Sequence, residues 1–234
     1  MELFNFNNSS DEIIRGKIIL INKPKLWSSF QVVNKIRYIL SKAYNIKKLK
    51  TGHAGTLDPL ASGLLILAVG KATKLIHNLQ EMSKVYYGEF CFGSTTPSYD
   101  LETTPNKKFS YKHLNKQMII NKTKDFIGLI DQKPPIFSAI KKKGKRLYEY
   151  ARNKEPIEIS PRKIEIKRFK IKSVNLPKVI FEVECSKGTY IRSLAHDFGA
   201  SLESGAHLSQ LKRTSIGKYK IENAKEISDF EKLI

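Results

Sequence analysis

Cysteine is scarce in this chain of 234 residues, which contains only Cys91 and Cys185. The two lie far apart and share no Cys-x-x-Cys spacing, which argues against a disulfide framework and a thiolate zinc site. The five histidines show no metal-ligand spacing. We therefore expect no metal centre, and we expect both cysteines, each in an alternating apolar run, to be buried thiols.

Long hydrophobic runs are also missing. None approaches the roughly 18 residues that a membrane-spanning helix needs, and the longest, residues 63–70, is far too short. Residues 1–11 are polar and carry no signal-peptide pattern. We therefore expect a cytoplasmic protein without a membrane partner. Hydrophobic residues still make up 41% of the chain, including 12 Phe and 10 Tyr, which is enough for a core.

Acidic residues are few beside basic ones: 42 Lys and Arg stand against 22 Asp and Glu, a net charge of +20. Such a surplus suits a polyanionic partner, above all nucleic acid. An AT-rich genome, which raises the Lys, Asn and Ile content of exposed sites, is an alternative cause. No basic amphipathic anchor points to a membrane surface.

The periodicity of apolar residues predicts strands and helices that alternate without a regular βαβ rhythm. This favours an α+β fold with a mixed, largely antiparallel central sheet flanked by helices and loops. Residues 1–14 are expected to be a loose tail, and residues 15–234 a single domain. The expected strands are 17–22, 63–69, 84–92, 164–174, 178–185 and 208–216, and the expected helices are 30–43, 110–124, 146–153, 189–203 and 226–233, with another short one from about residue 73.

The most irregular stretch is GHAGTLDPLASG, residues 52–63. It holds one carboxylate, Asp58, among small residues and directly before Pro59, with His53 five positions upstream. Proline favours an extended backbone at Asp58, and the glycines allow close approach of a ligand. The alternative is a tight turn in which Asp58 caps a helix or bonds its own backbone.

Two further clusters stand out. CSKGTYIRSLAHD, residues 185–197, places Lys187, Tyr190 and Arg192 near a strand-to-helix turn, although exposed cations at an ordinary helix start would look the same. Tyr86 follows Lys84 on a predicted strand, where an isolated tyrosine is more often a core residue than a stacking surface.

Together these clusters resemble one family, the bacterial TruB-type tRNA pseudouridine synthases. The resemblance covers about residues 16–219. It is carried by the segments GKIILINKPKLWSSFQVVNKIR, TGHAGTLDPLASGLLILAVGKATK, KVYYGEFCFG, KPPIFSAIKKKGKRLYEYAR, CSKGTYIRSLAHDFG and GAHLSQLKRTSIGKY. It implies the pseudouridine synthase catalytic fold and an isomerase that converts uridine 55 in the T-loop of tRNA by flipping the base, without metal or cofactor.

The resemblance also implies roles for single residues. Asp58 matches the catalytic aspartate, which adds to the sugar C1′, adds to the base, or stabilises separated charge; the sequence leaves these routes open. Arg192 matches the arginine that pairs with it, and Tyr86 matches a tyrosine that stacks on the target base. Leu211 matches an apolar pocket residue, His53 the residue that fills the space left by the flipped base, and Tyr190 joins these substrate-binding candidates.

The grip on the RNA backbone is expected from two basic patches. The first comprises Lys141, Lys142, Lys143, Lys145 and Arg146, and the second Lys212 and Arg213. Any one of these could be merely solvated.

Longer family members carry a C-terminal PUA-type RNA-binding module, and the chain stops at Ile234. We therefore expect no PUA domain, no guide RNA, and a monomer that binds the T-arm of tRNA. A non-catalytic RNA chaperone and a general basic RNA-binding protein remain as alternatives.

Overall fold

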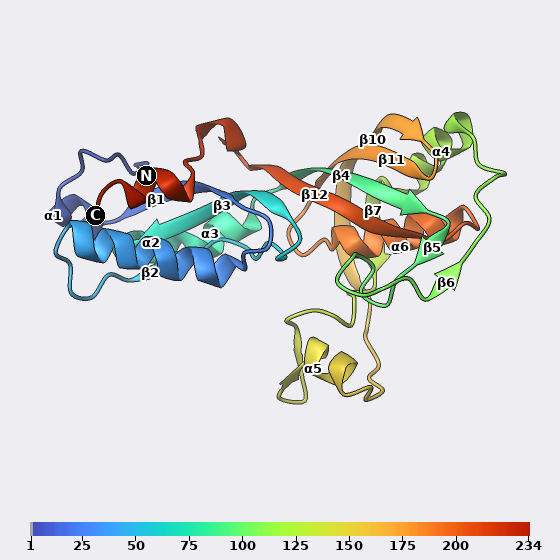
Figure 1. The fold of residues 1–234 in the computed structure, drawn as a ribbon, viewed down its shortest axis with the longest axis horizontal. Coiled ribbons are helices and arrows are strands. Elements are labelled where there is room, and N and C mark those ends of the chain that lie inside the picture. Colours follow the sequence, from blue (N-terminus) through green and yellow to red (C-terminus); the bar gives the residue numbers. More distant parts are fainter. Residues whose placement is uncertain (1) are drawn as a thin grey trace. The chain divides into compact units, whose positions relative to one another are not determined.

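Helices and strands alternate irregularly along residues 2–234, which the computed structural model describes (Figure 1). The strands are β1 (Lys17–Lys23), β2 (Thr51–His53), β3 (Ser62–Val69), β4 (Lys84–Phe92), β5 (Ser94–Thr95), β6 (Lys107–Lys108), β7 (Gly128–Gln132), β8 (Lys141–Lys142), β9 (Lys145–Arg146), β10 (Arg162–Asn175), β11 (Lys178–Cys185), β12 (Ala206–Ile216) and β13 (Tyr219–Lys220). The α-helices are α1 (Ser10–Arg15), α2 (Ser29–Ala43), α3 (Ile76–Glu81), α4 (Lys116–Lys122), α5 (Leu147–Arg152), α6 (Ile191–Ser201) and α7 (Ile227–Glu231). The 3-10 helices are η1 (Gly70–Leu75), η2 (Thr123–Phe126) and η3 (Ile221–Asn223).

The chain divides into two units. The first unit contains the chain up to Tyr86 together with Leu211–Ile234, and the second contains Tyr87–Gln210. Strands β4 and β12 each contribute residues to both units.

The sheet of the first unit is built around β3. Strand β1 pairs with one edge of β3 in antiparallel register, from Lys17 opposite Val69 to Lys23 opposite Gly63. The other edge of β3 pairs with two strands: β12 runs parallel to its beginning and β2 antiparallel to its end. The loop between β2 and β3 therefore begins at a strand that pairs with β3 and ends at β3 itself.

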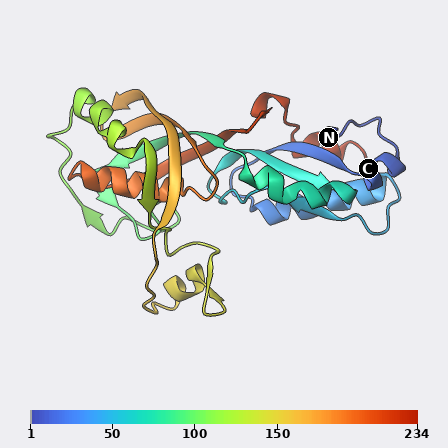
Figure 2. The ribbon, with the colours of Figure 1, turned by 180° about the vertical axis from the view of Figure 1, so that it is seen from behind.

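Both faces of β1 and β3 are covered, which explains their almost uninterrupted apolar sequences. Alternate residues enter different cores: Ile19, Ile21 and Leu65 pack with α2, whereas Ile18 and Leu20 pack on the side of η1 and α3. Figures 1 and 2 show α2 and α3 on opposite faces of this sheet.

Helix α2 begins where the sequence predicts. Ser28 accepts a hydrogen bond from the backbone of Gln31, whose side chain accepts one from Ser28 in return, forming a capping box. Val32, Val33 and Ile36 then recur at helical spacing and are buried. The start of α2 is therefore fixed close to the loop that follows β2, because Ser29 is bonded to Leu57 of that loop.

The expectation of a loose tail over residues 1–14 is wrong for the described residues 2–14. Helix α1 has its own capping box between Ser9 and Glu12, and Ile13 is fully buried in the core. Phe4 and Phe6 pack against the same core, with ring centroids 5.5 Å and 5.2 Å from Phe230. These contacts have no clear sign in the sequence, because six polar residues, 7–12, separate the apolar pair Phe4 and Phe6 from Ile13.

The second unit holds a sheet in the order β4, β11, β10, β7, in which β10 pairs antiparallel with both β11 and β7. The predicted hairpin of β10 and β11 is present, and Val179, Phe181, Val183 and Cys185 are fully buried on one face. Phenylalanines form the core beneath that face: Phe90 stacks on Phe181 at 3.9 Å between ring centroids, and Phe198 of α6 packs against Phe90 at 5.7 Å.

The predicted fold class, α+β with a largely antiparallel sheet, is confirmed. Strand β12, in contrast, pairs with β3 in parallel. The helix expected over residues 110–124 is shorter, because Asn115 caps α4 and the next turn is the 3-10 helix η2. Cys91 is half-buried rather than buried. None of the helices in the described part of the chain is long and apolar enough to cross a membrane.

Candidate functional site

The loop between β2 and β3 carries Asp58 and is tied to its surroundings at several points. The Ala54 backbone donates to the Ile66 carbonyl at 2.9 Å, and Leu57 exchanges two hydrogen bonds with the Ser29 hydroxyl at 2.9 and 3.1 Å. Ala61 donates to the carbonyl of Asp58 at 3.1 Å. Asp58 itself is half-buried. The sequence marks an irregular loop, and the structure shows that its backbone is fixed.

Arg213 holds this loop from within the first unit. Its side chain is 1% exposed and donates to the carbonyls of Leu64 at 2.8 Å, Gly55 at 3.1 Å and Thr56 at 3.3 Å. These bonds use all three guanidinium nitrogens. The prediction that Arg213 contacts the RNA backbone is therefore corrected: its side chain is buried and bonds carbonyls of the protein, two of them in the loop that carries Asp58.

Lys23 is a second buried cation of the same region, and sequence reasoning missed it. The side chain is fully buried, and its Nζ donates to the carbonyls of Trp27 at 2.6 Å and Pro24 at 2.9 Å. Burial lowers the pKa of Lys23 to about 8; the charge of Asp58 opposes this shift and that of Arg213 adds to it. The available signal was a lysine at the end of a largely apolar strand, directly before a proline.

His53 ends β2 and is half-buried. Burial, and to a smaller extent the positive charge of Arg213, lower the pKa of the His53 imidazole, against a hydrogen bond with the backbone of Gly55. The ring is therefore neutral near pH 7. Tyr86 is buried at 8% exposure, Leu211 is half-buried, and Lys212 is exposed. All of these residues belong to the first unit.

Arg192 lies in the first turn of α6, in the second unit. It is buried, its Nη1 donates to the Phe137 carbonyl at 3.0 Å, and its Nε lies 3.6 Å from Oδ2 of the buried Asp100. The alternative of an exposed cation at a helix start is therefore wrong for Arg192. Asp100 was missed because it stands in a polar loop with no motif of its own.

Tyr190 precedes α6 and is held by its backbone. Gln132 of β7 accepts a hydrogen bond from the Tyr190 amide at 2.8 Å and donates to the Tyr190 carbonyl at 3.1 Å. Ser193 of the same helix donates to the Lys133 carbonyl at 2.7 Å. These bonds fix the start of α6 against the segment that follows β7.

The first basic patch, residues 141–146, forms a small hairpin of β8 and β9 that leads into α5 and projects from the sheet of its unit (Figure 1). Lys141, Lys143, Lys145 and Arg146 are exposed, whereas Lys142 is half-buried and bonds the Glu158 carbonyl. Lys145 pairs with Glu155 at 3.4 Å. The hairpin therefore presents several cations to solvent.

The predicted site residues divide between the units. The first unit contains His53, Asp58, Tyr86, Leu211, Lys212 and Arg213, and the second contains Tyr190, Arg192 and the basic hairpin. Within the first unit, the loop that carries Asp58 follows directly after His53 and accepts hydrogen bonds from Arg213. The charge of Asp58 acts to raise the pKa of Lys23. The predicted pairing of Arg192 with Asp58 joins residues of different units and stays a prediction.

Comparison with known proteins gives the same assignment. The model of the TruB family pseudouridylate synthase N-terminal domain matches residues 41–191. The chain is 55% identical over 222 residues to tRNA pseudouridine synthase B of Flavobacterium johnsoniae, covering 94% of this chain and 97% of that protein. It is 45% identical to the protein of that name in Parabacteroides distasonis, covering 94% of each.

Solved structures agree with the sequence comparison. A chain of a Cbf5-Nop10-Gar1 complex superposes with a TM-score of 0.70 at 29% identity, and a chain of an H/ACA RNP bound to a substrate RNA containing 2'-deoxyuridine with 0.68 at 28%. The match covers 97% and 95% of this chain but only 59% and 54% of those longer chains. By sequence and by fold, the chain belongs to the TruB family of pseudouridylate synthases.

Proposed function

We propose that this protein isomerises uridine 55 in the T-arm of tRNA to pseudouridine, with Asp58 as the reacting carboxylate. The observation that carries the proposal is the Asp58 loop: a half-buried carboxylate on a backbone that Ser29 and Arg213 hold in place. The relatives named tRNA pseudouridine synthase B, which match over nearly their whole length, support tRNA as the substrate.

The reaction breaks the bond between C1′ and N1 of uracil, turns the base, and forms a bond between C1′ and C5. The C5 proton is lost and N1 gains one, so no electrons are exchanged with another reagent. A carboxylate suits this sequence, because it can bond to C1′ or to the base, or stabilise the charge that develops on the sugar. The fixed loop supplies the orientation that each of these routes needs.

The remaining residues of the first unit have roles that fit their environments. The buried ring of Tyr86 and the half-buried Leu211 offer apolar surface for a flipped base. The neutral ring of His53 offers a flat surface without charge, which suits the space that the base leaves. Tyr190 and Arg192 stay substrate-binding candidates, and Lys212 and the basic hairpin stay candidates for the RNA backbone.

The test is the production of pseudouridine in an unmodified tRNA transcript, mapped by position, with wild type and the Asp58→Ala variant. We expect product at position 55 with wild type only, and tRNA binding by both proteins. The control is Asp125→Ala, an exposed carboxylate paired with Lys122, which should leave activity unchanged. Light scattering of the same protein tests the expected monomer.

Two outcomes contradict the proposal. Activity of Asp58→Ala close to wild type removes the assigned role of this carboxylate. Tight tRNA binding by wild type without any pseudouridine favours the RNA chaperone instead, because a chaperone needs the basic surface but not the carboxylate.

A further inference from the structure

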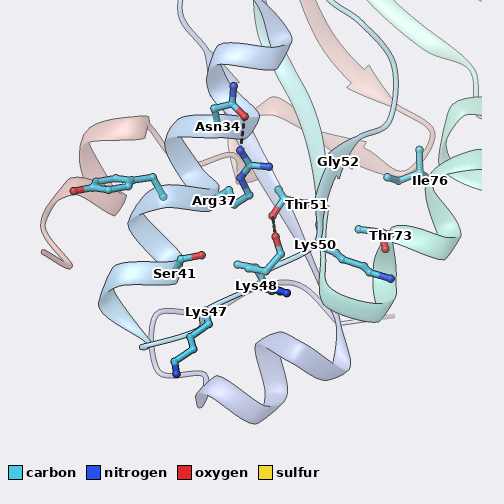
Figure 3. A pocket seen from close by; sticks show the side chains of 12 residues that line it. Asn34, Arg37, Ser41, Lys47, Lys48, Lys50, Thr51, Gly52, Thr73 and Ile76 are labelled. Atoms are coloured by element: carbon cyan, nitrogen blue, oxygen red, sulfur yellow. Dashed lines mark hydrogen bonds between the residues drawn. The ribbon is translucent and has the colours of Figure 1, made fainter.

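A pocket of about 830 Å³ opens in the first unit, between α2 and the segment that leads into β2 (Figure 3). Helix α2 forms one wall, the segment from Lys47 to Gly52 another, and Thr73 and Ile76 complete the lining. Gly52 packs closely against Ile76, because a Cβ at this position would lie 2.6 Å from Cδ1 of Ile76. The pocket is thus a feature of how α2, β2 and α3 pack together, and none of the roles proposed above uses it.

The charge of the pocket has one sign. Arg37, Lys47, Lys48 and Lys50 line it, and none of its lining residues is acidic. All four cations are exposed, and Arg37 spends one guanidinium nitrogen on the Asn34 side-chain oxygen at 2.9 Å. Like charges gathered around a concave surface raise its positive potential and attract anions. The pocket therefore favours an anionic ligand.

The directions of the cations indicate an extended ligand. Figure 3 shows the side chains of Lys47 and Lys50 pointing apart, on different sides of the segment that carries them. One small anion would need donors that converge on a point. Successive phosphates of a nucleic-acid strand meet cations spread along a surface. The exposed ring of Tyr38, which also lines the pocket, adds a surface on which a base can stack.

The position of the pocket along α2 separates it from the chemistry. Ser29, in the first turn of the helix, bonds Leu57 directly before Asp58, whereas the pocket contacts α2 from Asn34 to Ser41. At about 1.5 Å per residue, these contacts lie roughly 8 to 18 Å further along the helix axis. A phosphate held by Arg37 on this part of α2 belongs to a nucleotide other than the reacting one.

We propose that this pocket binds backbone phosphates of the tRNA, several nucleotides away from the uridine that reacts. The inference rests on the proposed function, since it takes tRNA as the ligand. A contact so far from the reacting base is made equally in the ground state and the transition state. It therefore contributes to affinity and leaves the chemical step unchanged.

The test removes two charges from the pocket with Arg37→Gln and Lys48→Gln in one protein. The matched control is Lys42→Gln with Lys220→Gln, two exposed lysines of the same unit, one of them also on α2, that do not line the pocket. Circular dichroism verifies that each protein is folded. The probe is an unmodified tRNA transcript, titrated at several salt concentrations, followed by turnover at saturating tRNA.

We expect the pocket variant to bind tRNA at least about 5-fold more weakly than the control. The negative slope of log K against log salt should become shallower by about 1.5, because each of the two lost phosphate contacts contributes about 0.7 to 0.9. Turnover at saturating tRNA should stay at the wild-type value. Equal affinity and slope in the two variants would overturn the proposal, and so would pyrophosphate binding that the pocket variant loses while its tRNA affinity is unchanged.

Failure of the pocket and failure of the proposed function are distinguishable. If wild type forms no pseudouridine but the pocket variant binds tRNA more weakly than the control, the RNA site is supported and the proposed enzymatic function is rejected. If pseudouridine forms at position 55 but the pocket variant and the control bind tRNA equally, the enzymatic function is supported and the RNA site in the pocket is rejected.

Discussion

Asp100 and Arg192 are buried together in the second unit, with Nε and Oδ2 3.6 Å apart. Asp100→Ala removes a buried carboxylate from beside the buried guanidinium, and we expect a loss of about 3 kcal/mol in the free energy of unfolding. Urea denaturation measures it. Glu182→Ala, which removes the partly exposed partner of Arg168, should cost less than about 1 kcal/mol. Equal costs would show that the buried pair adds no stability.

Lys23 predicts a dependence of stability on pH. Its pKa in the folded protein is about 8, below the ordinary lysine value of 10.5, so above pH 8 the unfolded chain holds the proton more tightly. The protonated Lys23 therefore lowers the free energy of unfolding below pH 8, and this destabilisation decreases as the pH rises from about 8 toward 10.5. Relative to Lys23→Met, we expect wild type to gain about 2 kcal/mol between pH 8 and pH 10. A constant difference between the two proteins across this range would contradict the shifted pKa.

Among single residues, the sequence points to the proposed site residues better than to the buried charges around them. Asp58 and Arg192 stand in motifs that the family resemblance identifies. Lys23 and Asp100 belong to no motif, and only the folded structure shows that they lie near other charged groups. Arg213 was assigned to RNA because composition cannot distinguish an exposed cation from one whose three nitrogens bond carbonyls inside the protein.

The approach of β12 to β3 gives a prediction at the scale of elements. Gly63 has φ +109°, and a Cβ there would lie 2.3 Å from the Arg213 carbonyl oxygen. Gly55 has the same φ, but its Cβ would meet only Nη1 of Arg213, at 3.8 Å. Both alanine variants carry backbone strain, and Gly63→Ala also forces the strands apart. We expect Gly63→Ala to be less stable than Gly55→Ala by at least about 2 kcal/mol in thermal unfolding.

A smaller loss in Gly63→Ala than in Gly55→Ala would mean that the parallel pairing of β12 with β3 is looser than the register indicates. In that case the positioning of the Asp58 loop by Arg213 would also need revision, because the same residue makes both contacts.

Elements with strong local patterns were predicted well. The apolar run of β3 and the capped, periodic α2 agree with the structure to within a residue or two. Strand β7 was missed, since Gly128–Gln132 is short and largely exposed, and its pairing partner β10 follows 30 residues later. Long-range pairing of this kind leaves no local signal.

The net charge of +20 belongs to the whole molecule and predicts a steep salt dependence of tRNA binding. Six phosphate contacts would give a slope of about −5 in log K against log salt. Lys141→Gln with Lys143→Gln, which removes two exposed cations of the basic hairpin, should weaken binding and make the slope shallower by about 1.5. Filter binding at several salt concentrations measures both. An unchanged slope would assign the hairpin charges to solvated surface.

The central claim is that one carboxylate on a fixed loop isomerises one uridine of tRNA. The most direct measurement is single-turnover conversion of an unmodified tRNA transcript, bound to an excess of wild type or of Asp58→Asn, with the product mapped by position. Asparagine keeps the size of the side chain and removes its charge. We predict pseudouridine at position 55 with wild type, and a rate at least about 1000-fold lower with Asp58→Asn despite full binding. Comparable rates, or product at another position, would contradict the claim.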